Sequence, residues 1–126
     1  MLFDTRFFIS LYHSKDAKQR RDLIEIAQAS SQKWVSAITV YEVYVVSQEL
    51  EGREVAKMRV DLLIKDFKVK PVDAQIARVA AELNHDRKVP MADAIIAATA
   101  KVISTVCITD DPHFKELEGI KTKWIS

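Results

Sequence analysis

The chain has 126 residues, of which 48% are hydrophobic and 29% are charged, and its formal net charge is +1. This composition predicts one globular domain over residues 1–126 and excludes a disordered chain. No apolar run reaches the roughly 18 residues of a membrane-spanning helix, the start does not read as a signal peptide, and the single cysteine excludes an internal disulfide, so we expect a cytoplasmic protein with no membrane partner.

Hydrophobic periodicity predicts short strands that alternate with helices. With two glycines and three prolines, the chain is poor in turn formers, and helices should dominate. The predicted elements are, in chain order, a strand at 2–3, helices at 5–12 and 15–29, a strand at 34–38, helices at 39–51 and on to about 66, a strand at 67–69, helices at 72–84 and 91–101, a strand at 105–109, a short helix at 112–117 and an edge strand at 123–125. This alternation predicts an α/β fold with a parallel sheet covered by helices on both faces.

Acidic residues fall where parallel α/β sheets bind their ligands. Asp4 follows the first predicted strand, and Asp110 and Asp111 follow a later one. Glu42 lies one turn into the helix after the second strand, and Asp93 lies in the first turn of another helix. Because ligands bind at the carboxyl ends of parallel strands, we expect most of these acids on one edge of the sheet, and Asp93 joins them if its helix starts there.

Each acid also has a structural alternative that involves no ligand. Asp4 is placed to cap the first helix, and Thr39 with Glu42 matches the capping-box pattern. Asp93 suits the positive end of a helix dipole, and the acid pair before Pro112 resembles a helix N-cap followed by proline. Taken one at a time, the acids are explained equally well by capping.

The surroundings of two acids favour a bound cation. Glu42 is the only acid or base within 34–46, and Asp93 is the only charge within 89–100, in an apolar helix that should be buried. Burying an unpaired carboxylate costs several kcal/mol, so such groups are usually paired with a cation. Oxygen ligands without a cysteine or histidine beside them suit Mg²⁺ or Mn²⁺ rather than zinc.

The three histidines are scattered, which fits a metal site made of oxygen ligands alone. His13 and His85 lie in polar contexts at helix ends and are expected at the surface. His113 follows the acid pair closely, which makes it a candidate for contact with substrate.

The segments around the acids resemble the PIN-domain family, in its small stand-alone form found as VapC-type toxins. The resemblance covers essentially the full length and rests on Leu2–Thr5, Ser36–Glu42, Pro90–Ala100 and Ile108–Phe114. It implies a three-layer α/β/α sandwich with a central parallel sheet, and endonuclease activity on RNA that depends on Mg²⁺ or Mn²⁺. It also implies an antitoxin protein as partner and a homodimer. The net charge of +1 is low for an RNA-binding protein, which usually carries a basic surface, but bound cations can neutralise phosphate locally.

The resemblance also implies roles for particular residues. The implied catalytic and metal-binding acids are Asp4, Glu42, Asp93 and Asp111. Asp110 is the alternative for the fourth acid or a supporting residue. Thr5 and Thr109 match positions whose hydroxyls support the acids. The candidates for contact with RNA are Arg6, Arg87, Lys88 and His113.

Apolar residues on two consecutive helices exceed what one small buried face needs. They are Tyr41, Val45, Val46, Met58, Leu62 and Leu63. They either belong to the core or form a groove for the helix of an antitoxin, which the resemblance implies.

Other functions stay open at this stage. A stand-alone PIN nuclease that processes ribosomal or transfer RNA without an antitoxin keeps the same fold. A phosphoryl-transfer domain is a more distant alternative, but a haloacid-dehalogenase-like phosphatase needs a second Asp two residues after Asp4, where Arg6 stands. A non-catalytic binding module is a third, and the complete set of acids argues against it.

Overall fold

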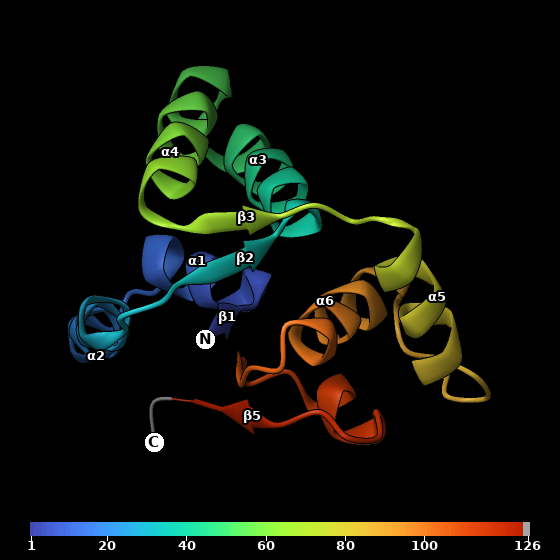
Figure 1. Cartoon of the computed structure of the whole chain (residues 1–126). Coiled ribbons are helices and arrows are strands. Elements are labelled where there is room, and N and C mark those ends of the chain that lie inside the picture. The colour runs from blue at the N-terminus through green and yellow to red at the C-terminus, as the bar shows by residue number, and fades with distance from the viewer. Residues whose placement is uncertain (125–126) are drawn as a thin grey trace.

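Five parallel strands form one sheet in the computed structural model, which describes residues 1–124 (Figure 1). The strands are β1 (Leu2–Phe3), β2 (Trp34–Ser36), β3 (Lys68–Lys70), β4 (Cys107–Ile108) and β5 (Thr122–Lys123). Their order across the sheet is β3-β2-β1-β4-β5, and every neighbouring pair is parallel. The first strand of the chain is therefore the central strand, and its carboxyl end lies between those of β2 and β4.

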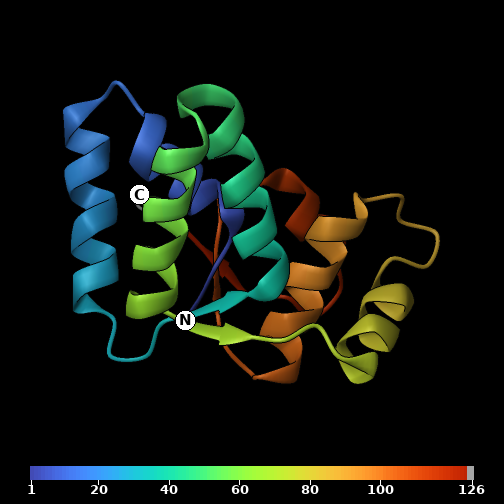
Figure 2. The same cartoon turned by 90° about the horizontal axis from the view of Figure 1, so that it is seen from above.

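Helices cover both faces of the sheet, so the predicted three-layer α/β/α architecture is confirmed. The helices are α1 (Thr5–His13), α2 (Ala17–Ala29), α3 (Ala37–Glu51), α4 (Arg53–Asp66), α5 (Ala74–Leu83), α6 (Met91–Val102) and the 3₁₀ helix η1 (Pro112–Glu116). Figure 2 shows α2 and α4, in blue and green, on one side of the sheet and α5 and α6, in yellow and orange, on the other. Among residues 1–124, no helix is long and apolar enough to cross a membrane.

The two faces of the sheet support two separate hydrophobic clusters. Successive strand residues point to opposite faces, so Leu2 belongs to the cluster under α5 and α6, and Phe3 to the cluster under α1–α4. Cys107 and Ile108 divide in the same way. Six of the twelve residues of α6 are buried, in keeping with its apolar sequence. A shift of one residue in the pairing of β1 would turn its buried side chains to the wrong faces of the sheet. The burial of Leu2 and Phe3 on opposite faces therefore fixes the position of Asp4 at the end of β1.

The start of α3 differs from the sequence prediction. We expected a strand to residue 38 and a helix from Thr39, but β2 ends at Ser36 and α3 begins at Ala37. The Ser36 side chain accepts a hydrogen bond from the backbone N–H of Ile38 at 3.2 Å and caps the helix. The capping box of Thr39 and Glu42 is therefore wrong, because both lie inside the helix. The carboxylate of Glu42 is not needed to cap α3.

Replacing this cap should weaken the fold by a modest amount. For Ser36→Ala we expect the free energy of unfolding to fall by about 1 kcal/mol, the usual loss when a serine N-cap becomes alanine. Urea titration followed by circular dichroism measures it, with the exposed Ser31→Ala as the matched control. A Ser36→Ala protein as stable as the parent would contradict this assignment of the cap.

Other differences are small and have local causes. The helix expected from residue 72 begins at Ala74, because the Asp73 side chain caps it through the N–H of Ile76. The strand predicted at 105–109 is shorter, and the predicted edge strand is β5, whereas Ile125 lies outside the described residues. His13 was expected at the surface, but it is half-buried, with Nδ1 3.4 Å from Glu51.

Candidate active site

Asp4 lies at the centre of the site, directly after the central strand. Its backbone N–H donates to the carbonyl of Ile108 on β4, and its side chain is almost completely buried. Oδ1 accepts a hydrogen bond from the N–H of Thr5 at 2.8 Å, so Asp4 caps α1. Oδ2 accepts from the hydroxyl of Thr109 at 2.7 Å. The capping alternative for Asp4 is thus confirmed, and both of its oxygens are fixed in position.

Burial raises the pKa of Asp4 to about 7, because the interior disfavours its charged form. The hydrogen bonds from Thr109 and Thr5 lower this pKa, and the negative charges of Asp93 and Asp111 raise it. Asp4 therefore lies within electrostatic range of the acids that come from α6 and from the end of β4. A carboxylate in such surroundings is stabilised by any cation that reaches it.

Glu42 reaches the same region from α3. Its Oε1 accepts a hydrogen bond of 2.6 Å from the hydroxyl of Thr5. The Thr5 hydroxyl also lies 3.1 Å from the hydroxyl of Thr39, whose side chain is completely buried. Because Thr5 has one hydroxyl proton and donates it to Glu42, Thr39 is the donor between the two threonines. Thr5 was predicted from the sequence to support the acids, whereas Thr39 was considered only as the start of a capping box. Thr39 lies one helical turn before Glu42, so the two side chains share a face of α3, and this spacing could have indicated that both reach Thr5.

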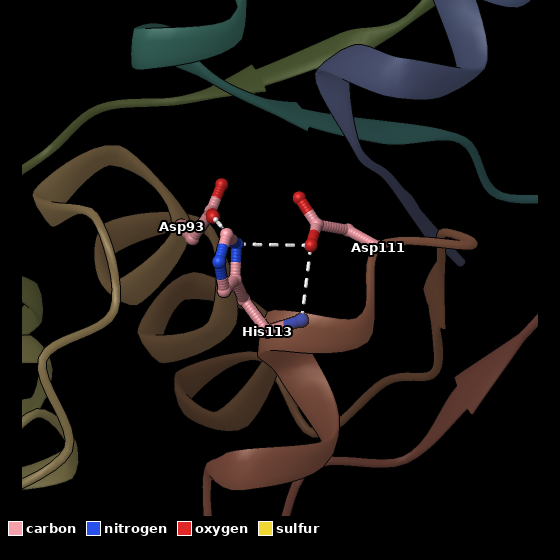
Figure 3. Close-up of side chains that lie close together, drawn as sticks. All are labelled: Asp93, Asp111 and His113. Atoms are coloured by element: carbon pink, nitrogen blue, oxygen red, sulfur yellow. Dashed lines mark hydrogen bonds and ion pairs between the residues drawn. The ribbon is translucent and has the colours of Figure 1, made fainter.

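Asp93 and Asp111 lie on either side of His113 (Figure 3). The Nδ1 atom of His113 is 3.0 Å from Asp93 Oδ2 and 3.0 Å from Asp111 Oδ1. Asp111 also accepts from the backbone N–H of His113 at 2.9 Å and caps η1, as the acid before Pro112 suggested. The second oxygens of the two carboxylates point to the same side, away from the imidazole.

The pKa of Asp93 is raised, first by burial and then by the negative charge of Asp111. The hydrogen bond and charge of His113 lower this pKa, and Glu42 raises it. All four acids named from the sequence are thus linked by mutual repulsion, although they come from four separate segments. The charge of Asp93 raises the pKa of Asp4, which is the electrostatic coupling expected of acids that share a ligand.

Asp110 and Asp111 point to different places. Asp110 forms an ion pair with Arg6, with Nε 2.7 Å from Oδ1, and its side chain is 34% exposed. The side chain of Asp111 is 11% exposed and faces Asp93 through His113. The geometry therefore favours Asp111 as the fourth acid and gives Asp110 a partner that sequence reasoning missed.

The remaining basic candidates lie apart from the acids. Arg87 lines a hollow of about 460 Å³ together with Asp86 and residues that follow His113, and none of the four acids lines it. Lys88 is exposed in the loop before α6. Of the basic residues proposed from the sequence, Arg6 and His113 lie at the site.

One expectation about this site is wrong. The sequence suggested acids without a histidine companion, but donor atoms of Asp93, Asp111 and His113 all lie within 4.8 Å of one another. The spacing of these residues along the chain hides the contact, because His113 is 20 residues from Asp93. The fold brings them together by placing η1 against the first turn of α6.

The arrangement suits a divalent cation. Burial, and then repulsion from neighbouring acids, raises the pKa of both Asp4 and Asp93, so their ionised forms lack sufficient compensation from the protein. Carboxylate oxygens are the ligands that Mg²⁺ and Mn²⁺ favour, and a bound ion would supply the missing positive charge. The residues present therefore fit such an ion.

A profile of the PIN-domain family matches residues 1–120, which is nearly the whole chain. The chain belongs to the PIN-domain family. The phosphoryl-transfer alternatives, which require other folds, no longer apply. No curated protein sequence matches this PIN domain.

Solved structures of VapC-type toxins share its fold. A toxin–antitoxin complex from Klebsiella pneumoniae matches with 27% identity and a TM-score of 0.75, over 99% of this chain and 97% of that one. DNA-bound VapBC from Salmonella typhimurium matches with 20% identity and a TM-score of 0.81, over 99% and 97%. VapC20 from Mycobacterium tuberculosis, a toxin that cleaves the sarcin–ricin loop, matches with 19% identity and a TM-score of 0.75, over 90% and 92%. This PIN domain is therefore similar to toxin chains over nearly their full length.

Proposed function

We propose that residues 1–126 act as one PIN domain that hydrolyses RNA phosphodiester bonds with the help of Mg²⁺ or Mn²⁺, as the toxin of a VapBC-type pair. The observation that carries the proposal is the meeting of Asp4, Glu42, Asp93 and Asp111 at the carboxyl edge of the sheet. Membership in the PIN-domain family and the likeness to a toxin that cleaves the sarcin–ricin loop support it.

The acids have different roles in this proposal. Asp4 and Asp93 are the main metal ligands, since their raised pKa values mark them as the least compensated charges. Glu42 is a ligand or orients the attacking water, and Asp111 completes the set. When bound, the ion would lower the pKa of a water molecule and neutralise the phosphate.

Threonine hydroxyl groups form hydrogen bonds with three of these acids. Thr109 donates to Asp4 and accepts from the backbone N–H of Asp111 at 3.0 Å, so it joins two acids through one side chain. Thr5 orients Glu42. Such supporting hydrogen bonds typically change metal affinity or activity by about 10–100-fold when they are removed.

Arg6 is the basic residue best placed to meet the RNA backbone. Its side chain is 52% exposed at the rim of the acid cluster, and Asp110 holds the guanidinium by an ion pair. Arg87 and Lys88 are candidates for more distant phosphates. An exposed arginine recognises phosphate through paired hydrogen bonds, and its charge offsets the acids around it.

Metal removal tests the proposal directly. We expect the purified chain to cleave RNA in the presence of Mg²⁺ or Mn²⁺, to stop when EDTA is added, and to recover when excess metal is restored. Total cellular RNA is the first substrate, with cut sites mapped by sequencing of the new ends. Cleavage that continues in EDTA would contradict the metal role, and a chain inert toward all RNA would contradict the enzyme.

An antitoxin and a second copy of the chain are the proposed protein partners. Tyr41, Met58 and Leu62 on α3 and α4 are 64%, 63% and 55% exposed, which is unusual for large apolar side chains. Leu63 belongs to the core, which was one of the two alternatives that the sequence left open for these residues. The toxin–antitoxin complexes among similar structures support an antitoxin as one partner. Because its proposed substrate is cellular RNA, we propose that the protein acts in the cytoplasm.

A further inference from the structure

The side chain of His113 turns toward the acid cluster although it has access to solvent. His113 lies in the first turn of η1, where its backbone N–H bonds to Asp111, and its side chain is 44% exposed. An exposed histidine in this place has room to turn toward solvent. Instead its Nδ1 atom points back between the carboxylates of Asp93 and Asp111 (Figure 3).

The distances around Nδ1 match those between neighbouring ligands of one metal ion. Around an ion held at about 2.1 Å in octahedral geometry, donor atoms on adjacent corners lie about 3 Å apart. The Nδ1 atom lies 3.0 Å from Asp93 Oδ2 and 3.0 Å from Asp111 Oδ1. Donor atoms of all three residues also lie within 4.8 Å of one another, which is close enough for a single ion to reach them all.

We propose that His113 is a nitrogen ligand of the divalent cation, through Nδ1, beside Asp93 and Asp111. The inference rests on the proposed function, because it concerns the same metal site. It also changes the expected selectivity, since imidazole nitrogen suits transition-metal ions better than Mg²⁺, which prefers oxygen. A site with one nitrogen ligand favours Mn²⁺ over Mg²⁺ more strongly than a site of carboxylates alone.

The competing explanation is that His113 pairs with the acids only while no cation is bound. In that case Nδ1–H donates to a carboxylate, and an arriving ion displaces the imidazole toward solvent. The two explanations differ in one measurable property, which is whether nitrogen is bonded to the metal in the loaded protein.

Pulsed electron paramagnetic resonance of the full chain loaded with Mn²⁺ makes this distinction. We expect modulation from a directly bound ¹⁴N nucleus in the wild-type protein, and its replacement by the ¹⁵N pattern when only histidine is labelled with ¹⁵N. The modulation should disappear in His113→Ala and persist in His85→Ala, whose side chain is 81% exposed and pairs with Asp86. The labelling experiment needs no variant, so it decides the question even if a substitution disturbs η1.

Binding measurements test the selectivity. In His113→Ala we expect Mn²⁺ affinity to fall at least about tenfold, a loss no smaller than that for a supporting residue, and Mg²⁺ affinity to change by less. If Mn²⁺ binds to the wild type, is lost in Asp93→Asn and yet shows no histidine nitrogen, the inference about His113 is overturned and the proposed metal site stands. If the wild type binds no Mn²⁺, or Asp93→Asn binds it equally well, both proposals are overturned.

Discussion

Asp93→Asn is expected to lower the rate of metal-dependent RNA cleavage by at least about 100-fold while the fold is retained. The substitution removes a negatively charged ligand and keeps the shape of the side chain. Loss of a residue that only supports a ligand commonly costs about 10–100-fold, so loss of a ligand should cost no less. Initial cleavage rates at saturating Mg²⁺ or Mn²⁺ measure the effect.

The fold should be retained because the negative charge of Asp93 repels the neighbouring carboxylates. Its negative charge raises the pKa of Asp4, so its removal relieves repulsion within the cluster. The matched control is Asp86→Asn, which changes an acid with an 85% exposed side chain in the loop before α6 and should leave cleavage unchanged. If Asp93→Asn cleaves RNA at the wild-type rate, the assignment of the site is wrong.

Asp4→Asn is expected to stabilise the metal-free protein at pH 8 by about 2–4 kcal/mol. The pKa of Asp4 is about 7 in the folded chain, against 3.8 as its ordinary value. Below pH 3.8 the carboxyl is protonated in both states, and between 3.8 and 7 only the folded state holds the proton. Stability therefore falls as pH rises through this window, and above pH 7 the ionised group costs at most about 4 kcal/mol, at about 1.36 kcal/mol per pKa unit.

Asparagine fits the position of Asp4 without this charge. Its oxygen can accept from the N–H of Thr5, and its amide can donate to the hydroxyl of Thr109, which replaces both hydrogen bonds. Urea titrations at pH 5 and pH 8 measure the free energy of unfolding of both proteins. The advantage of Asp4→Asn over the wild type should be smaller at pH 5 than at pH 8. Asp16→Asn, which alters an exposed cap of α2, serves as the control and should change little at either pH.

Metal should reverse the order of the two proteins. Saturating Mn²⁺ stabilises a folded state that binds it, so wild type should gain stability and Asp4→Asn should gain little. A wild type that is equally stable with and without Mn²⁺ at pH 8 would show that Asp4 is not a ligand. An Asp4→Asn protein less stable than wild type in metal-free buffer would show that burial does not penalise its charge.

The sequence was sufficient to predict the alternation of elements and the edge where the acids meet. Parallel strands place their carboxyl ends together, so Asp4 and the pair of Asp110 and Asp111 followed from position once the strands were recognised. The choice of Asp111 within that pair came from the family resemblance. The apolar residues around Asp93 predicted that its helix is buried. The absence of a lysine or arginine near it in the sequence predicted that a cation balances its charge. The α/β/α architecture followed from the same alternation and is confirmed.

Contacts between side chains distant in the chain were beyond the reach of periodicity. The pairing of His113 with Asp93 depends on how η1 packs against α6, and the pairing of Arg6 with Asp110 joins residues 104 positions apart. The start of α3 was misplaced because Ser36 and Thr39 are both good N-caps, and hydrophobic pattern does not choose between them. The hydrophobic pattern also left Leu63 open between core and groove, since both sides of α4 carry apolar residues and only one packs on the sheet.

The two hydrogen bonds that hold the carboxylate of Asp4 lower the entropic cost of binding a ligand to it. With Oδ1 held by a backbone amide and Oδ2 by Thr109, this carboxylate has no rotamer freedom left to lose on binding. The entropic cost of ordering a side chain, about 0.5–1.5 kcal/mol for a mobile one, has already been met during folding. In the proposed metal site, Asp4 would therefore present a carboxylate whose position is already fixed before the ion arrives.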